Sequence, residues 1–335
     1  MSAPDHEHDA ILLLSFGGPE GPDDVLPFLE NVTSGRGVPR ERLEEVAQQY
    51  ERFGGVSPIN EQNRALLAAL RAELDRRGID LPLHWGNRNW APFVEDTMTE
   101  LADAGHRRVL ALATSAYASY SACRQYLEDI ERARAHVGDR APVVDKIRPY
   151  WDEPGFREAV RSRVADAVAQ APAGARLVFT AHSIPLSMAS TSDYETQLRA
   201  VASATADAVA PQVEWDLVFQ SRSGPPRVPW LEPDIVDHLP ALHDGGTTAV
   251  VVAPIGFVSD HMEVKFDLDT QAAEAARELG MTMVRAGTVG THPAFVSGLV
   301  DLIERHAAGN GAVCPPDCCP APARGRPTPV SPAPS

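Results

Sequence analysis

LVFTAHSIP at residues 177–185 and ILLLSFGGP at residues 11–19 share one pattern, in which a strand-length apolar run leads into small residues and a proline. Apolar runs of this length, bounded by turn residues, are typical of strands buried on both faces of a sheet. A looser pair, LALATSAYAS (110–119) and AVVVAPIGFVS (249–259), repeats the pattern in the same order along the chain. The repetition predicts two halves of similar topology.

Helical patterns alternate with these strands. Residues 60–77 carry Leu66, Leu70 and Leu74 on one face and end at Gly78, which is a typical helix stop. Alternation of strands and helices is typical of parallel sheets covered by helices on both faces. We therefore expect an α/β fold of two similar Rossmann-like, doubly wound domains. The expected domains are residues 9–150 and 151–309, with ligands bound in the cleft between them.

Composition excludes several classes of function. The 335 residues include 46 acidic and 30 basic side chains, for a formal charge of -16, which disfavours non-specific binding to nucleic acid. The longest apolar runs are the length of a strand and too short to cross a bilayer, and the N-terminus is too polar for a signal peptide. We expect a cytoplasmic protein.

An acidic row follows the strand predicted at residues 248–253. Glu263, Asp267 and Gln271 are spaced at i, i+4 and i+8, so on a helix they lie along one face. Carboxylate and amide oxygens in a row suit the passage of a metal cation. The alternative is a solvated acidic face near a helix N-terminus, where acidic residues are favoured in any case.

His182 also stands at the carboxyl end of a predicted strand, where its imidazole suits a metal ligand or a general base. The alternative is a histidine satisfied by local hydrogen bonds. A serine hydrolase is disfavoured at His182 and Ser183 because the G-x-S-x-G elbow is absent. The loop at residues 16–21 matches neither a dinucleotide fingerprint nor a P-loop, so we expect no nucleotide.

The chain has four cysteines, Cys123, Cys314, Cys318 and Cys319. The last three lie in residues 310–335, a proline-rich tail that lacks the large apolar side chains of a core. Four thiolates would complete a metal or cluster site and would pin such a tail to the rest of the chain. The alternative is unligated thiols, which the irregular C-x3-C-C spacing leaves open.

Five segments together resemble the ferrochelatase family: LLLSFGGPEGPDDVLPFLENV (12–32), FGGVSPIN (53–60), VFTAHSIP (178–185), FQSRSGPPRVPWLEPD (219–234) and PIGFVSDHMEVKFDLD (254–269). The resemblance runs from about residue 11 to residue 306. It implies two Rossmann-like domains around a porphyrin cleft, and insertion of Fe2+ as a substrate into the porphyrin with release of two protons.

The resemblance also implies roles for individual residues. His182 and Glu263 match facing cleft residues that act in catalysis and bind iron. Asp267 continues a metal path on a π-distorted helix, and Asp260 and His261 match supporting residues. The residues expected to contact the porphyrin are Phe16, Arg36, Ser57, Tyr117 and Tyr120. Two departures stand out: Phe16 replaces the tyrosine of some bacterial members, and Gln271 replaces a third acid.

The cysteines are similar in number and placement to those of a branch that includes the actinobacterial enzymes. That branch implies a [2Fe-2S] cluster on Cys123 and the three tail cysteines, and coproporphyrin III as the substrate, which becomes coproheme in heme b biosynthesis. We also expect a monomer that meets other heme-pathway enzymes transiently.

Two alternative functions remain. One is a non-catalytic clamp that binds tetrapyrrole or iron, and the other is a nucleotide-dependent Rossmann enzyme, which the missing phosphate loop disfavours.

Overall fold

Two four-stranded parallel sheets form the centre of the computed structural model, which describes residues 7–35, 37–224, 227–315 and 317–321. The first sheet has the order β2-β1-β3-β4 and the second the order β6-β5-β7-β8. The first sheet contains β1 (Ala10–Ser15), β2 (Leu83–Asn87), β3 (Arg108–Ala113) and β4 (Val143–Lys146). The second contains β5 (Arg176–His182), β6 (Trp215–Gln220), β7 (Ala249–Ala253) and β8 (Thr282–Arg285). The order repeats element for element, which confirms the predicted doubly wound α/β fold with two similar halves.

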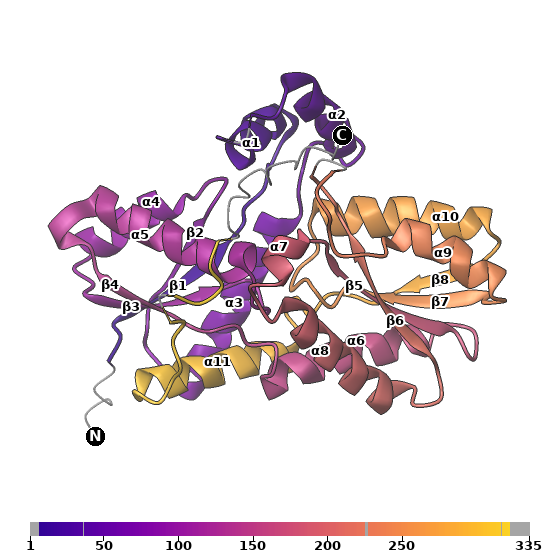
Figure 1. Ribbon diagram of the computed structural model, residues 1–335. Helices are drawn as coiled ribbons and strands as arrows, with labels where there is room; N and C mark the ends of the chain where they lie inside the picture. The colour runs from indigo at the N-terminus through magenta and orange to yellow at the C-terminus, as the bar shows by residue number, and fades with distance from the viewer. Residues whose placement is uncertain (1–6, 36, 225–226, 316, 322–335) are drawn as a thin grey trace, which may run out of the picture.

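The central strands of each sheet form because their residues are mostly apolar on both faces. All six residues of β1 and all five of β7 are buried. Helices cover the outer faces: α4 (Val94–Asp103) and α5 (Gln125–Val137) on the first sheet, α9 (Ile235–Asp244) and α10 (Ala273–Glu278) on the second. Figure 1 shows these helices above their sheets. Both faces of each sheet are therefore removed from water, as parallel sheets require.

One continuous apolar core joins the two sheets. It takes Ile11 and Leu13 from β1 and Leu177 and Phe179 from β5. The helices that complete it are α3 (Ile59–Arg77), α6 (Pro154–Val168), α8 (Tyr194–Val209) and α11 (Pro293–Ala307). Although α11 follows the second sheet in the chain, it packs against α3 of the first half. The predicted domain boundaries at residues 150 and 309 stay a prediction.

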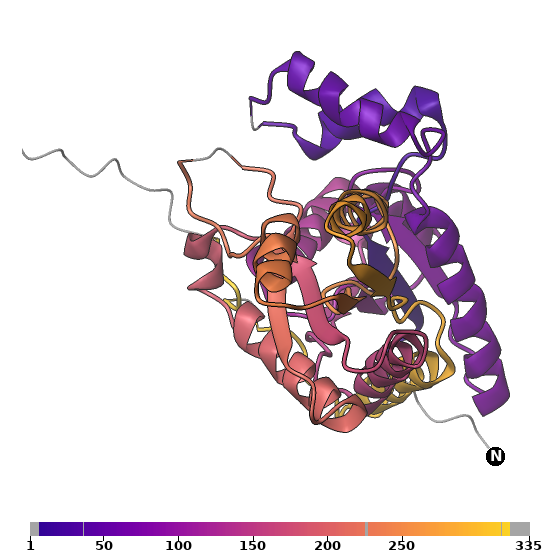
Figure 2. The same cartoon turned by 90° about the vertical axis from the view of Figure 1, so that its right-hand side faces the viewer.

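A small helical unit stands apart from both sheets, as Figures 1 and 2 show. It consists of α1 (Val25–Val32) and α2 (Arg40–Glu51), with its own core around Phe28. The ring of Phe28 makes edge contacts with those of Phe16, Tyr50 and Trp90, at centroid distances of 6.2, 6.1 and 6.3 Å. The guanidinium of Arg52 lies 5.8 Å from the ring centroid of Phe266. These contacts connect the unit to both halves.

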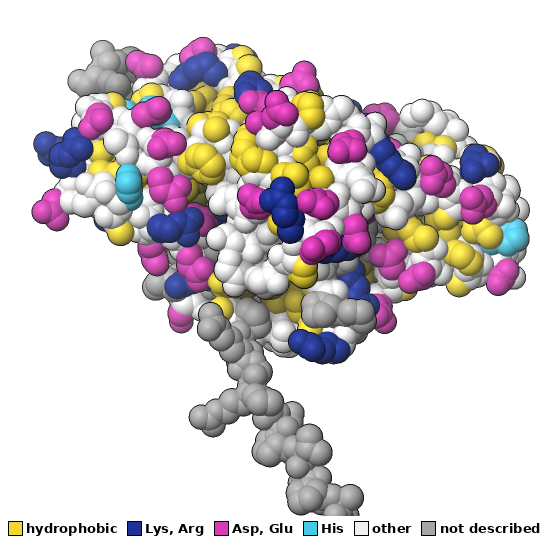
Figure 3. All heavy atoms as spheres, turned by 90° about the horizontal axis from the view of Figure 1, so that it is seen from above, with side chains coloured by type: hydrophobic (Ala, Val, Ile, Leu, Met, Phe, Trp, Pro, Cys, Tyr) yellow, Lys and Arg dark blue, Asp and Glu magenta, His cyan; other side chains and the backbone are white. Residues whose placement is uncertain are grey.

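Seen from above, Asp and Glu side chains are spread over the surface, with Lys and Arg side chains interspersed among them (Figure 3). In the described part of the chain, no helix combines the length and the apolar character that crossing a bilayer demands.

Candidate active site and cysteine site

The carboxyl end of β5 and the segment that follows β7 bring His182 and Glu263 together. His182 is the last residue of β5, and Glu263 immediately precedes a π-helix, η4 (Val264–Ala272). The Nε2 atom of His182 lies 3.4 Å from Oε1 of Glu263, and both side chains remain partly exposed. The predicted pairing of these two residues across the site is therefore present in the geometry.

Three further contacts hold this pair. The Nδ1–H of His182 donates to the carbonyl oxygen of Ser183, which directs Nε2 toward Glu263. The hydroxyl of Tyr194 donates to the carbonyl of His182 at 3.1 Å, and Nε2 of Gln220 donates to the carbonyl of Glu263 at 3.1 Å. Sequence reasoning missed Tyr194 and Gln220, because both act on backbone oxygens that only the folded chain brings near.

Mutual attraction sets the charge state of the pair. Burial alone lowers the pKa of His182, but the charge and hydrogen bond of Glu263 outweigh it and raise that pKa to about 9. Burial likewise raises the pKa of Glu263, but His182 outweighs it and lowers that pKa to about 2. At neutral pH the site thus holds an imidazolium beside a carboxylate.

Asp267 lies on η4, beyond Glu263. The hydroxyl of Ser221 donates to its Oδ2, and Ser221 holds this position with a φ of 63°, which a serine rarely adopts. Burial raises the pKa of Asp267 to about 7, and the nearby charge of Glu263 adds to the effect. Asp267 therefore changes charge close to neutral pH.

The helix that carries the acidic row is not the regular α-helix that the spacing assumed. Residues Val264–Ala272 form a π-helix, as the resemblance implied, and Gln271 is exposed. Among the described residues, the groups of three metal-ligating atoms within 4.8 Å include cysteines only. His182, Glu263 and Asp267 are therefore an open row, which suits passage of a substrate ion better than permanent retention.

The residues expected to contact a porphyrin lie in different surroundings. Phe16 is 39% exposed, whereas Ser57 is buried and its N–H donates to the carbonyl of Pro19. The hydroxyl of Tyr120 donates to Glu128. Tyr117 lies in the core, only 1% exposed, and its hydroxyl has no hydrogen-bond partner there.

Arg36 lies outside the described residues, so the structure does not place it. The roles of all five residues in binding stay predictions.

Supporting residues surround Glu263 from its own segment. The Nδ1 of His261 accepts a hydrogen bond from the N–H of Glu263 at 3.2 Å, and burial lowers the pKa of His261, which favours a neutral ring. Asp260 pairs with Arg285, both oxygens lying 3.3 Å from the guanidinium. Its N–H donates to Gln62 on α3 at 2.8 Å, so the segment is tied to the first half as well.

The cysteines meet at a second site. Cys123 lies in a short π-helix, η2 (Tyr120–Arg124), and its Sγ is 3.0 Å from that of Cys314, which is 2.7 Å from that of Cys318. The tail reaches this place by pairing with the end of β4. Val313 forms an antiparallel bridge with Ile147, and the N–H of Cys314 donates to the carbonyl of Lys146 at 3.0 Å.

The donor set fits an iron–sulfur cluster. All four cysteines are free, and Cys319 has a φ of 48°, a strained conformation of the kind found at functional sites. Hydrogen bonds from Cys314 and then Cys319 lower the pKa of the Cys123 thiol, and the ammonium of Lys146 adds to this against the effect of burial. Converging thiols with one stabilised thiolate are the ligands that such clusters require.

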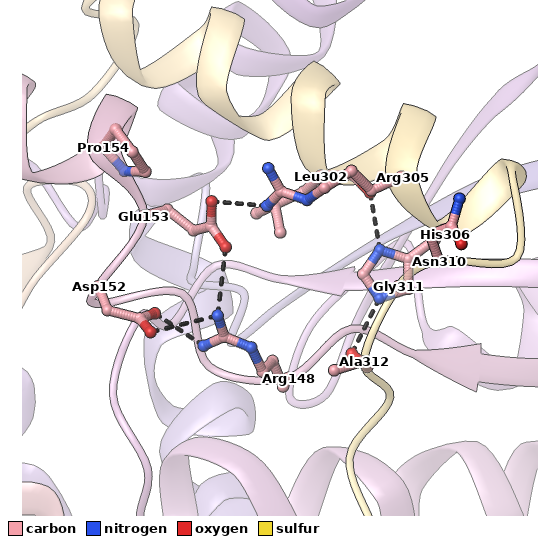
Figure 4. Close-up of a pocket in the computed structure, with 10 residues that line it drawn as sticks. All are labelled: Arg148, Asp152, Glu153, Pro154, Leu302, Arg305, His306, Asn310, Gly311 and Ala312. Carbon is pink, nitrogen blue, oxygen red and sulfur yellow. Dashed lines mark hydrogen bonds and ion pairs between the residues drawn. The ribbon is translucent and has the colours of Figure 1, made fainter.

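A hollow of about 320 Å³ lies beside α11 and the start of the tail (Figure 4). Its charged side chains pair with one another: Arg148 with Asp152 at 2.7 Å, and Arg305 with Glu153 at 2.6 Å. Because these charges are neutralised within the hollow and none of its lining residues belongs to the predicted sites, we assign no ligand to it.

Comparison with known proteins identifies the family to which the chain belongs. The family model described as Ferrochelatase matches residues 8–307. The coproporphyrin III ferrochelatase of Streptomyces coelicolor is 51% identical over 351 residues, covering 94% of each chain. That of Mycolicibacterium smegmatis is 54% identical over 336 residues, covering 92% of this chain and 98% of its own.

A solved structure of SirB from Bacillus subtilis with Fe3+ covers 90% of this chain and 96% of its own, with a TM-score of 0.56 at 15% identity, and supports the fold alone. The matching family model and the two relatives, which span nearly the whole chain, carry the assignment. This chain belongs to the ferrochelatase family.

Proposed function

We propose that this protein is a coproporphyrin III ferrochelatase, which inserts Fe2+ into coproporphyrin III to give coproheme in heme b biosynthesis. The observation that carries the proposal is the facing pair of His182, at the carboxyl end of β5, and Glu263, at the start of η4. Relatives about half identical to this chain bear that name. We further propose that the enzyme works as a monomer in the cytoplasm.

The reaction exchanges two pyrrole protons for one dication, so the site must accept protons and attract iron. In the resting pair the imidazole of His182 already holds a proton, and the carboxylate of Glu263 is ionised, which suits it to bind the incoming ion. Asp267 titrates near neutral pH and is placed to take up a proton or to attract iron farther along the row. The three groups can therefore handle both exchanged species.

A metallation assay tests the activity. Purified protein given Fe2+ and coproporphyrin III under anaerobic conditions should give the absorption spectrum of coproheme, faster than with protoporphyrin IX. His182→Ala and Glu263→Gln should each lower kcat by about 100-fold or more, the range for losing a general acid or base. Glu158→Gln is the control, because Glu158 lies on α6 in an exposed pair with Arg161. Stoichiometric porphyrin binding without metallation would instead indicate a non-catalytic clamp.

We also propose that Cys123, Cys314, Cys318 and Cys319 hold a [2Fe-2S] cluster. The convergence of the sulfur atoms and the pairing of the tail with β4 support it. When bound, the cluster would supply one-electron redox chemistry and would cross-link the tail to η2. Iron and acid-labile sulfide analysis of anaerobically purified protein tests this, and colourless protein with neither element contradicts it.

A further inference from the structure

The chain uses lysine at two places. Of its 30 basic residues, only Lys146 and Lys265 are lysine. Lys265 lies at the surface, where its ammonium pairs with Asp269 at 3.0 Å. Lys146 is the last residue of β4 and is only 4% exposed. A chain that otherwise relies on arginine therefore places a compact ammonium in its interior.

The partners of this ammonium are unusual. The Nζ atom lies 3.4 Å from Sγ of Cys123 and donates to the carbonyl of Ile147 at 3.1 Å. No carboxylate pairs with it among the residues that the structure describes. Burying an ammonium costs several kcal/mol unless an opposite charge compensates it. Anionic sulfur is the compensating charge that the surroundings offer.

Lys146 also contacts the tail. Its carbonyl oxygen accepts the hydrogen bond from the N–H of Cys314, and the next residue, Ile147, pairs with Val313. The residue thus contacts two of the four cysteines, one through its side chain and one through its backbone. This position is fixed by β4 and by the paired tail, so the charge cannot move away when the sulfur atoms change their state.

We propose that Lys146 sets the reduction potential of the cluster that the four cysteines hold, through its fixed positive charge and its N–H···S hydrogen bond to Cys123. The inference rests on the cluster proposed above. One-electron reduction adds one negative charge to a cluster that four thiolates already make anionic. A neighbouring cation favours the more negative state, and hydrogen bonds to sulfur act in the same direction, so Lys146 raises the potential.

Redox titration of the full-length protein with dithionite, followed by EPR and visible absorption, tests the inference. Lys146→Met removes the charge and keeps a side chain of similar length. We expect at least a tenfold shift of the equilibrium toward the oxidised form, which corresponds to about 59 mV for one electron. Lys146→Arg keeps the positive charge, so its reduction potential should stay close to that of the wild-type protein. Arg140→Met is the matched control, because it removes a cation from an exposed pair with Asp103 just before β4.

Each outcome decides the question. If Lys146→Met holds the cluster at an unchanged potential, the inference is wrong while the cluster stands. If wild-type protein contains no cluster, both proposals fail, and metallation activity is judged separately. If Lys146→Met fails to assemble the cluster, the potential of Lys146→Arg decides the question. A potential close to that of the wild-type protein supports the inference, and a tenfold or larger shift of the equilibrium with the charge kept contradicts it.

Discussion

Asp267 changes its charge near neutral pH, because its pKa lies far above that of a free aspartate. The folded site raises its pKa from 3.8 to about 7, so the folded state binds this proton more tightly than the unfolded chain does. Stability therefore falls as the pH rises from 3.8 to about 7, and the full cost remains above that range. An acid kept at such a cost serves the chemistry of the site and not the stability of the fold.

Asp267→Asn should therefore stabilise the protein more at pH 8 than at pH 5, because the amide has no charge to bury. Urea unfolding at the two pH values measures the difference. Asp207→Asn, at an exposed position on α8, is the control. An equal gain at both pH values would show that burial of the Asp267 charge is not the cause.

Residues whose placement follows from the local sequence were predictable. His182 follows an apolar run, and a parallel strand of that kind delivers its last side chain to the ligand edge of the sheet. Ser221 and Tyr194 were not predictable, since a hydroxyl reveals its acceptor only when another segment packs beside it. Tyr117 looks like a loop residue in the sequence, yet it is buried and its ring makes edge contacts with those of Phe156 and Tyr194.

At the scale of elements, the close approach of two segments positions His182. Gly256, which follows β7, donates its N–H to the carbonyl of Thr180 on β5 at 3.1 Å. A Cβ on Gly256 would lie 2.6 Å from Cβ of Ala181, the residue before His182. Only a residue without a side chain allows this approach, so Gly256 acts as a positioning residue for the site.

Gly256→Ala should push the end of β5 aside. We expect a loss of about 1–3 kcal/mol in the free energy of unfolding, as for other overpacked sites, together with lower metallation activity. Chemical denaturation and the metallation assay measure the two effects. Gly287→Ala is the control, since its Cβ would meet only the side chain of Arg163 at 3.6 Å. Equal effects of both changes would refute the positioning role.

The central strands were the most predictable elements. A short, mostly apolar run bounded by turn residues is typical of a buried strand and is too short for most helices. The shape of η4 was not predictable from spacing, since Glu263, Asp267 and Gln271 fit an ordinary α-helix equally well. The segment around η4 is held by contacts from elsewhere in the fold. Gln62 accepts a hydrogen bond from Asp260, which precedes η4, and Arg285 pairs with Asp269 inside it. Those contacts come from distant parts of the chain.

At the scale of the whole molecule, Arg77 joins the two halves. It lies at the end of α3, and its side chain is only 15% exposed. Its guanidinium pairs with Asp301 at 2.5 Å and Glu304 at 2.6 Å on α11, and donates to the hydroxyl of Ser297 at 2.7 Å. Together with the shared apolar core, this contact keeps the halves in one arrangement around the site.

Arg77→Met should lower the free energy of unfolding by about 1–3 kcal/mol, the cost of leaving charged hydrogen-bond partners unsatisfied. Arg76→Met is the matched control, because Arg76 is the neighbouring residue, is mostly exposed and pairs with Glu73. We expect almost no change for that variant. Denaturant unfolding compares them, and equal losses would mean that the contact with α11 adds nothing.

The packing of α11 on α3 also has a consequence for the order of synthesis. Arg77 and Asp301 are separated by 224 positions, so α3 leaves the ribosome long before its partner helix exists. Domains usually fold one after another as they emerge. Until α11 has been translated, the face of α3 that packs against it stays uncovered. The nascent chain must keep that apolar face from aggregating in the meantime, which makes it the natural place for a chaperone to act.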